Sequence, residues 1–287
     1  MKCLIAYNKN SGKGKVIKWV GHIVERLKTK YKTIDIFESK FKNDIKNHLS
    51  YYGFNYDCVV IMGGDGTLHE AINGLMGNIK RPIIGYIPFG TCNDFGRSYN
   101  LKKDVIKCIN VILTGKTKSI DIFKINSDYF CYGMAIGNLT NISYDTNQKN
   151  KKIFGRLAYY FYVLKDMFSD NSFKCNLLLN EEKSIKNCFC LIGIKTKYLA
   201  SFKIKKDNEK FKIFIVNKTN KLIGLFDLLM LFIIGEKYKH NIDYFESQTI
   251  NIISDNPLRC NVDGEALPLM KEIKIEKISR AINMFIE

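Results

Sequence analysis

A glycine turn that joins an apolar strand to a helix is the most constraining feature of this sequence. Residues 58–62 (Cys-Val-Val-Ile-Met) have the pattern of a buried strand, which stops at Gly63-Gly64-Asp65-Gly66, and Thr67 opens a helical pattern. In this geometry the backbone N–H groups and the helix dipole favour binding of a phosphate. The glycines, which have no Cβ atom, let the phosphate approach the main chain closely. Asp65 beside a phosphate indicates a cation or a proton-handling role. The stretch predicts phosphoryl transfer; a plain strand-to-helix turn is the alternative.

Strands and helices alternate over the first 120 residues. The predicted strands cover residues 4–7, 33–37, 58–62 and 82–87, and the predicted helices cover 16–28, 42–52, a segment from 67, and 105–113. This alternation predicts a Rossmann-like parallel α/β domain over residues 1–120, with helices on both faces of the sheet.

Short β-prone runs dominate the rest of the chain. They cover residues 121–125, 129–136, 173–179, 188–194, 211–216, 249–253 and 272–278, with helical interruptions near 155–168 and 222–234. Many short strands predict a β-sandwich domain over residues 121–287, whose C-terminal end can pack back on the first domain. The predicted fold class is therefore α/β plus β.

Two more polar loops follow predicted strands of the first domain. Residues 90–97 (Gly-Thr-Cys-Asn-Asp-Phe-Gly-Arg) come after one strand, and residues 8–15 (Asn-Lys-Asn-Ser-Gly-Lys-Gly-Lys) come after another. Loops after successive parallel strands meet at the carboxyl edge of the sheet. Asp65 and Asp94 are thus expected to lie near each other and to hold Mg²⁺, through water as needed. The alternatives are an Asn-Asp turn that caps a helix and an ordinary loop.

A fourth polar segment lies far along the chain, at Val262-Asp263-Gly264-Glu265. By itself it is an ordinary turn between two strands. If it faces the glycine loop, one of its carboxylates could accept a proton from an attacking hydroxyl group.

The chain is basic, with 45 Lys and Arg against 28 Asp and Glu and a formal net charge of +17. This balance indicates an anionic partner, although a lysine-rich composition explains it as well. Nucleic acid is not expected, because no binding motif accompanies the charge. The longest apolar run falls short of the roughly 20 residues that span a bilayer. With nine cysteines but no CxxC pair, we expect a cytoplasmic protein without a transmembrane segment.

Two apolar segments suggest how the protein could contact a lipid. Residues 222–234 are flanked by lysines, which is typical of an interfacial helix. A helix packed in the core is the alternative. The aromatic run at 159–164 could line an acyl-chain pocket, although aromatic clusters are more often plain core.

With these segments in this order, the sequence resembles the diacylglycerol kinase catalytic-domain superfamily of lipid kinases. The resemblance covers nearly the whole chain and rests on Gly63 to Thr67, on Gly90 to Phe95 and on Asp263 to Glu265. It implies a nucleotide-binding domain, a β-sandwich domain and an active site with ATP in the cleft between them.

The resemblance also implies roles for particular residues. The residues implied in ATP binding are Asn8, Ser11, Gly12, Ser39, Gly63, Gly64, Asp65, Gly66, Thr67, Leu68, His69 and Thr91. The residues implied in Mg²⁺ binding are Asp65, Asp94 and Asp121. The implied proton acceptor is Glu265, with Asp263 beside it.

The sequence departs from the family pattern at three places. Lys9 replaces a common proline, and His69 replaces a common asparagine. Bacterial members often carry an Asp-Asp-Gly turn at a structural Mg²⁺ site. The nearest segment here, residues 206–211, lacks the glycine and keeps one clear carboxylate, Asp207, so the persistence of that site is open.

The expected function is an ATP-dependent lipid kinase that converts diacylglycerol to phosphatidic acid at the anionic inner face of a membrane. A NAD kinase-like phosphotransferase, which shares the Gly-Gly-Asp-Gly loop, is one alternative. A non-catalytic nucleotide- or lipid-binding regulator is another. An exposed strand edge would also allow a homodimer.

Overall fold

The computed structural model describes residues 1–101, 103–138, 171–179, 182–204 and 210–286. They form two compact units. The first comprises Met1–Phe123, Asp128–Cys131 and Ile278–Glu287, and the second comprises Lys124–Ser127 and Tyr132–Lys277. The predicted order, an α/β domain followed by a strand-rich domain, is confirmed.

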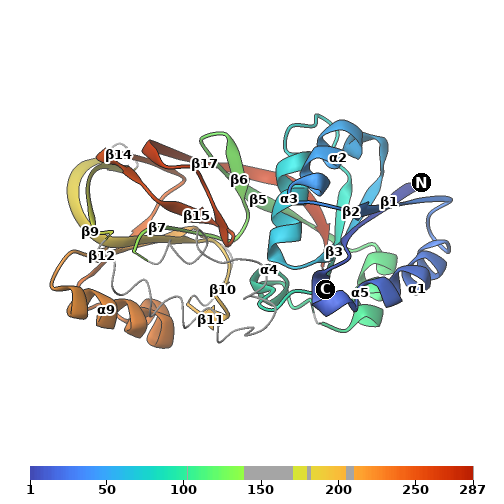
Figure 1. The fold of residues 1–287 in the computed structure, drawn as a ribbon, viewed down its shortest axis with the longest axis horizontal. Helices are drawn as coiled ribbons and strands as arrows, with labels where there is room; N and C mark the ends of the chain where they lie inside the picture. Colours follow the sequence, from blue (N-terminus) through green and yellow to red (C-terminus); the bar gives the residue numbers. More distant parts are fainter. Residues whose placement is uncertain (102, 139–170, 180–181, 205–209, 287) are drawn as a thin grey trace. The chain divides into compact units, whose positions relative to one another are not determined.

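The first unit is built on a parallel sheet with the strand order β17-β4-β3-β1-β2 (Figure 1). Its strands are β1 (Lys2–Asn8), β2 (Thr33–Ser39), β3 (Cys58–Gly63), β4 (Ile83–Pro88) and the end of β17 (Met270–Phe285). The chain runs from β1 to β2 on one side and then returns to β3 on the other side of β1. The strand order therefore reverses between β1 and β3, which is the switch point where open α/β sheets bind ligands.

Helices cover both faces of this sheet. They are α1 (Ile17–Leu27), α2 (Asp44–Tyr52), α3 (Asp65–Leu75), the short α4 (Asp94–Ser98) and α5 (Val105–Thr114), with 3-10 turns η1 (Ser11–Gly14) and η2 (Gly53–Asn55). Helices α1 and α5 lie on one face, and α2 and α3 lie on the other (Figure 1). These bounds match the predicted helices to within a few residues.

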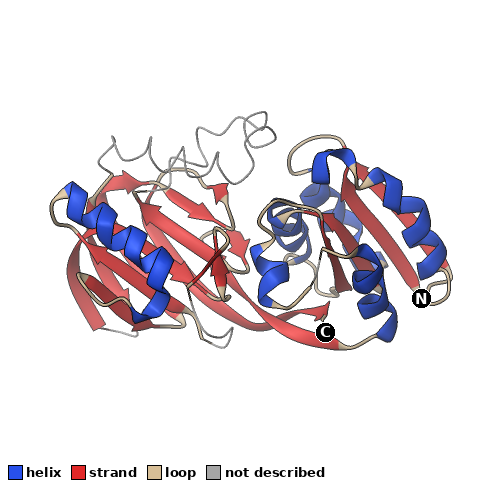
Figure 2. Cartoon of the chain, turned by 90° about the horizontal axis from the view of Figure 1, so that it is seen from below, coloured by secondary structure: helices blue, strands red, loops and turns tan. Residues whose placement is uncertain are grey.

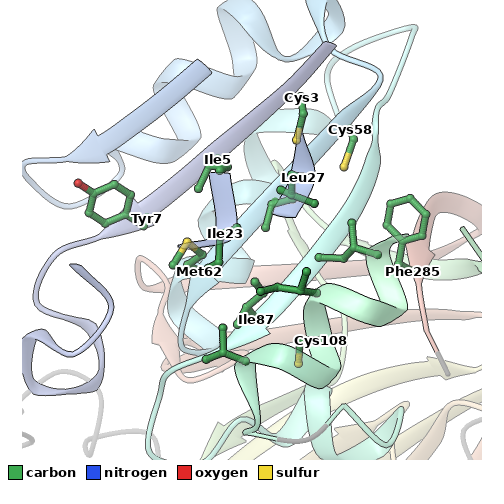
Figure 3. Close-up of a cluster of buried hydrophobic side chains, with 14 of the residues drawn as sticks. Cys3, Ile5, Tyr7, Ile23, Leu27, Cys58, Met62, Ile87, Cys108 and Phe285 are labelled. Carbon is green, nitrogen blue, oxygen red and sulfur yellow. The ribbon is translucent and has the colours of Figure 1, made fainter. Parts of the chain in front are cut away.

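One face of the sheet buries a continuous apolar cluster (Figure 3). Cys3 and Ile5 of β1 pack with Met62 of β3 and with Leu27 of α1. Strands that are covered on both faces read as unbroken apolar runs, as residues 58–62 do. Phe285 of β17 joins the same cluster, so the C-terminal end of the chain completes the first core.

The second unit is formed mainly of antiparallel strands in the order β16-β15-β7-β9-β8-β14. Strand β12 pairs with β9 and β13, and β14 pairs with the first part of β17. Strand β5 (Thr117–Ile125), for most of its length, and β6 (Asp128–Phe130) belong to the first unit. The strands of the second unit are β7 (Gly133–Gly137), β8 (Phe173–Leu179), β9 (Glu182–Ile194), β10 (Tyr198–Leu199), β11 (Phe202–Lys203), β12 (Lys212–Asn217), β13 (Ile242–Glu246), β14 (Thr249–Leu258), β15 (Cys260–Val262) and β16 (Glu265–Ala266), together with the first part of β17.

The expectations about this part of the chain have different outcomes. The predicted strand over 129–136 is two strands, β6 and β7, separated at residues 131–132. The predicted helix over 222–234 is α9 (Lys221–Ile234), followed by the 3-10 turn η3 (Gly235–Lys237). The helix expected near 155–168, the aromatic run at 159–164 and Asp207 lie outside the described residues. Among the helices that are described, none is long and apolar enough to cross a membrane.

A buried carboxylate attaches α9 to the segment that follows it. Asp227 is fully buried, and it accepts hydrogen bonds from the Tyr238 hydroxyl at 2.6 Å and from Asn241 Nδ2 at 3.0 Å. His240 Nδ1 lies 2.7 Å from the same carboxylate. Burial alone would raise the pKa of Asp227, but the hydrogen bonds from these three side chains outweigh it and lower the pKa.

We expect Asp227→Asn to lower the free energy of unfolding at pH 7 by about 1–3 kcal/mol, because a buried network loses its charged acceptor. Since the folded-state pKa lies below the unfolded value of about 3.9, the carboxylate stabilises the fold above that pH. This contribution is lost as the pH falls through the folded pKa. Urea unfolding followed by circular dichroism should therefore show the two proteins converging below about pH 4.

Asp255→Asn is the matched control, because Asp255 lies exposed on β14 in the same unit. It should change stability by no more than a few tenths of a kcal/mol, about 0.5 at most. A gap between wild type and Asp227→Asn that stays constant with pH would contradict the role of the charge.

Candidate functional site

The carboxyl edge of the parallel sheet gathers most of the residues singled out in the first domain. Asn8 at the end of β1 is aligned with Ser39 at the end of β2, and Gly63 at the end of β3 is aligned with Pro88 at the end of β4. The loops that follow these strands therefore start side by side. They flank the switch point between β1 and β3.

The loops after β3 and β4 touch through their main chains at Gly64 and Gly90. A Cβ atom on Gly90 would lie 2.6 Å from the Gly64 Cα atom, and a Cβ atom on Gly64 would lie 3.1 Å from the Gly90 Cα atom. Beside this contact, the Phe89 N–H group donates to the Gly63 carbonyl oxygen at 2.7 Å. Only glycine permits this approach, so the two glycine motifs form one structural feature.

The Asp65 carboxylate strengthens the same connection. It accepts hydrogen bonds from the backbone N–H groups of Asp94, at 3.2 Å, and of Phe95, at 3.4 Å. These groups belong to the first turn of α4, where N–H groups have no earlier helical carbonyl to bond. A negative charge also suits the positive end of a helix. Asp65, itself the first residue of α3, thus brings the second and third polar segments together.

Two residues around this contact were not singled out from the sequence as site residues. Asn93 adopts a left-handed conformation with φ 53°, and its Nδ2 donates to the Gly90 carbonyl oxygen at 2.9 Å. Tyr86 is buried beneath them, and this burial raises the pKa of Tyr86 well above its ordinary value. The nearby charges of Asp65 and Asp94 raise it further, so the Tyr86 hydroxyl stays protonated.

Lys103 is a further residue that sequence reasoning missed. Its Nζ atom donates to the carbonyl oxygens of Gly90, at 3.3 Å, and of Thr91, at 3.1 Å. Thr91 itself is exposed. The lysine places a positive charge on the loop after β4, but no motif marks it among the many lysines of the chain.

The loop after β1 packs on the residue that precedes Gly90. Gly12 has φ +60°, and a Cβ atom there would lie 3.2 Å from the Phe89 ring. Within this loop, the Asn8 Oδ1 atom accepts a hydrogen bond from the Asn10 N–H group at 2.9 Å. Ser11 and Gly12 are partly exposed. All three predicted loops therefore meet at one edge of the first unit.

Residues of α3 divide into an accessible first turn and a buried remainder. Gly64 to Thr67 are partly exposed, whereas Leu68 is fully buried and His69 is 8% exposed. The His69 ring lies 3.3 Å from Asn73 Nδ2, and Asn73 in turn bonds the backbone of Tyr129 at both its N–H and its carbonyl group. The side chains of Leu68 and His69 thus support the helix from within the fold.

The carboxylates predicted to bind Mg²⁺ are not all placed alike. The backbone N–H group of Asp94 bonds the partly exposed Asp65 carboxylate, while the Asp94 residue itself is 2% exposed. Asp121 is on β5 and accepts a hydrogen bond from the Arg280 N–H group at 3.0 Å. Among the described residues, no three His, Cys, Asp or Glu side chains are grouped to hold a metal ion. Two carboxylates beside a phosphate-binding turn suit Mg²⁺, which is commonly bound by one or two carboxylates together with phosphate oxygens and water.

In the second unit, Asp263 and Gly264 form the tight turn between β15 and β16. Their φ values are +51° and +84°, as the two central residues of a type I′ hairpin turn require. The Asp263 carboxylate is 2% exposed and accepts hydrogen bonds from the N–H groups of Tyr132, at 2.9 Å, and Gly133, at 3.1 Å. Asp263 thus fixes the turn against β7, and Glu265, paired with Val262, is partly exposed at its end.

Comparison with known proteins identifies the family. The family model described as the diacylglycerol kinase catalytic domain matches residues 2–125, which contain all three loops. A diacylglycerol kinase of Staphylococcus saprophyticus is 34% identical over 279 residues, which cover 91% of this chain and 88% of the relative. This chain belongs to the diacylglycerol kinase family. A second member, from Staphylococcus epidermidis, is 38% identical over 227 residues, or 73% of this chain and 68% of the relative.

A solved structure shows the same fold. The crystal structure of a diacylglycerol kinase from Bacillus anthracis matches with a TM-score of 0.82 and 21% identity, covering 100% of this chain and 97% of the other. Family membership makes this chain a lipid kinase, and a kinase of this family implies ATP as the phosphate donor. The diacylglycerol kinase resemblance seen in the sequence is confirmed.

We expect Gly90→Ala to separate the two loops, because its Cβ atom would overlap the Gly64 main chain. The substitution should lower the free energy of unfolding by about 1–3 kcal/mol. It should also remove most of the rise in melting temperature that ATP with Mg²⁺ causes in the wild type. Thermal unfolding with and without nucleotide measures both effects.

Gly21→Ala provides a matched control in α1, where a Cβ atom would meet no described atom within 4 Å. This variant should be neutral or more stable by about 0.4–1 kcal/mol and should respond to ATP as the wild type does. A Gly90→Ala protein with a normal ATP response would show that the loop contact is not needed for nucleotide binding.

Proposed function

We propose that this lipid kinase transfers the γ-phosphate of ATP to the free hydroxyl group of diacylglycerol and so forms phosphatidic acid. The observation that carries the proposal is the main-chain contact of Gly64 with Gly90 at the switch point of the sheet, where Asp65 begins a helix. The name shared by the relatives from two Staphylococcus species supports diacylglycerol as the acceptor.

ATP binds with its phosphates against the first turn of α3. The turn from Gly63 to Thr67 offers backbone N–H groups at the positive end of the helix, and its glycines leave room for phosphate oxygens. The loop after β1, with Asn8, Ser11 and Gly12, borders this turn through Phe89. Ser39, aligned with Asn8, and Thr91, beside Gly90, complete the proposed nucleotide contacts.

Asp65 and Asp94 hold Mg²⁺ together with the phosphates. The two N–H hydrogen bonds that Asp65 accepts are long, at 3.2 and 3.4 Å. Asp65 is partly exposed at this turn, so its carboxylate can approach a metal ion or the water ligands of that ion. When bound, Mg²⁺ neutralises charge that develops on the phosphate oxygens. Asp121 belongs to β5 and not to the loops after β3 and β4, so the proposal gives it no such role.

Glu265 acts as the proton acceptor. Its carboxylate takes the proton of the lipid hydroxyl group as that oxygen forms a bond to the γ-phosphorus atom, while the bond from this phosphorus to the β,γ-bridging oxygen breaks and ADP leaves. The assignment rests on the family turn Asp263-Gly264-Glu265. Asp263, whose carboxylate is bonded to the backbone of Tyr132 and Gly133, positions the turn and does not take the proton.

The reaction takes place at the anionic inner surface of a membrane, where both ATP and a bilayer lipid are available. The net charge of +17 supports this location, because basic side chains are attracted to anionic lipid head groups.

The test is phosphate transfer from γ-labelled ATP to a panel of acceptors: diacylglycerol, monoacylglycerol, a sphingoid base and NAD. Wild-type protein should label diacylglycerol most efficiently. Glu265→Gln should reduce this turnover by about 10²- to 10⁴-fold, the usual contribution of a general base, and should leave the ATP-induced thermal shift intact.

Glu272→Gln, which changes an exposed carboxylate on β17, is the control and should keep full turnover. Normal turnover by Glu265→Gln would remove Glu265 as the base. Labelling of NAD alone, or of no acceptor, would overturn the proposed function.

A further inference from the structure

Helix α9 lies along the strands of the second unit (Figure 2), and within the described residues it buries Gly224, Asp227, Leu228 and Leu231. Leu228 and Leu231 are buried in an apolar cluster with Phe189 of β9 and Phe214 of β12. Asp227, on the same side of the helix, is held by Tyr238 and Asn241. The core of the unit therefore covers this face of α9, and the hydrogen bonds to buried Asp227 fix the rotation of the helix about its own axis.

The other face of α9 is apolar and exposed. Its exposed side chains, with their exposed fractions, are Leu222 (72%), Ile223 (44%), Phe226 (56%), Leu229 (53%), Ile233 (62%) and Ile234 (42%). Leu222, Phe226, Leu229 and Ile233 follow one another at spacings of four, three and four residues, so they form a single stripe along the helix. We call these six residues the α9 stripe.

The α9 stripe differs from the rest of the described surface. It holds six of the eighteen large apolar side chains that are exposed among the described residues, although the helix has only 14 residues. Apart from the buried Asp227, residues 222–234 carry no charge. Concentrated apolar patches of this kind mark interaction sites on soluble proteins.

The charges at the two ends of α9 indicate what covers the stripe. Lys218 and Lys221 lie at its start, and Lys237 and Lys239 follow its end. Among the described residues that directly follow the helix, Glu236 carries a carboxylate, and Lys212 binds it at 2.5 Å, which offsets its charge. An apolar stripe between two pairs of lysines complements a surface that is apolar inside and anionic at its border.

We infer that the α9 stripe is the surface by which this protein docks on an anionic lipid bilayer. At about 1.5 Å per residue the helix is about 21 Å long, too short to cross a bilayer, so it lies parallel to the membrane plane. The stripe enters the boundary of the acyl chains, and the four lysines contact the anionic head groups. The inference rests on the proposed function in one respect, namely that a diacylglycerol kinase must reach a substrate dissolved in a bilayer.

Co-sedimentation of the full chain with vesicles tests this surface without using catalysis. Wild-type protein should bind vesicles of phosphatidylglycerol and phosphatidylcholine, and bind vesicles of phosphatidylcholine alone more weakly. The double substitution Phe226→Ser with Leu229→Ser should lower the partition coefficient by about tenfold or more, because two apolar side chains no longer enter the bilayer. Both residues are exposed, so circular dichroism and melting temperature should remain those of the wild type.

Ile185→Ser is the matched control, since Ile185 is 66% exposed on β9 of the same unit but lies outside the stripe. It should bind vesicles as the wild type does. Lys218→Gln with Lys237→Gln should weaken binding to anionic vesicles and leave the weak binding to phosphatidylcholine unchanged.

Activity provides a second readout that separates this inference from the proposed function. The stripe variant should phosphorylate a short-chain, water-soluble diacylglycerol at the wild-type rate and a bilayer diacylglycerol much more slowly. If the wild type has no activity on either lipid but vesicle binding depends on the stripe, the proposed function fails and the docking surface stands.

Three results would overturn the docking surface. The first is no binding of the wild type to anionic vesicles, and the second is equal binding by the wild type and the stripe variant. The third is a wild-type dimer in sedimentation velocity that the stripe substitutions dissociate while vesicle binding persists, because the stripe would then be covered by a second copy of the chain.

Discussion

The close approach of the Gly64 and Gly90 main chains is the constraint on which the rest of the candidate site depends. It turns two loops, which follow two neighbouring strands, into one surface beside the switch point of the sheet. The helix that begins at Asp65 and the short helix that begins at Asp94 are then close enough for a single carboxylate to connect them. A side chain at Gly90 would overlap the Gly64 main chain, push the loops apart and misplace both helix ends.

Two of the acidic residues in the family motifs bind the protein's own backbone. Asp65 accepts N–H groups of α4, and Asp263 accepts N–H groups at the start of β7. In each case the carboxylate fixes a turn rich in glycine, which would otherwise sample many conformations. Asp65 is partly exposed, whereas Asp263 is buried. The proposed roles differ accordingly: Asp65 meets Mg²⁺, and Asp263 positions its neighbour Glu265.

Periodicity and motif order predicted much of this fold, because buried parallel strands and glycine turns leave strong local patterns. The α/β order, helix α3 and helix α9 all follow from such patterns. The strand order does not, since it depends on contacts between distant residues, and neither does the bond from Asp121 to Arg280, 159 residues away. The role of Lys103 has no local signal either. For α9, the sequence allowed a core helix or an interfacial helix. One side of the helix packs in the core, and the other side exposes the apolar stripe.

The proposed function requires the loops after β1, β3 and β4 to form one ATP site. Hydrogen exchange of the wild-type protein, with and without a non-hydrolysable ATP analogue and Mg²⁺, tests it directly because exchange reports opening of each backbone segment. Bound nucleotide should slow exchange together in peptides covering residues 8–14, 63–69 and 90–95. Unchanged exchange at residues 63–69, or protection confined to a different part of the chain, would contradict it.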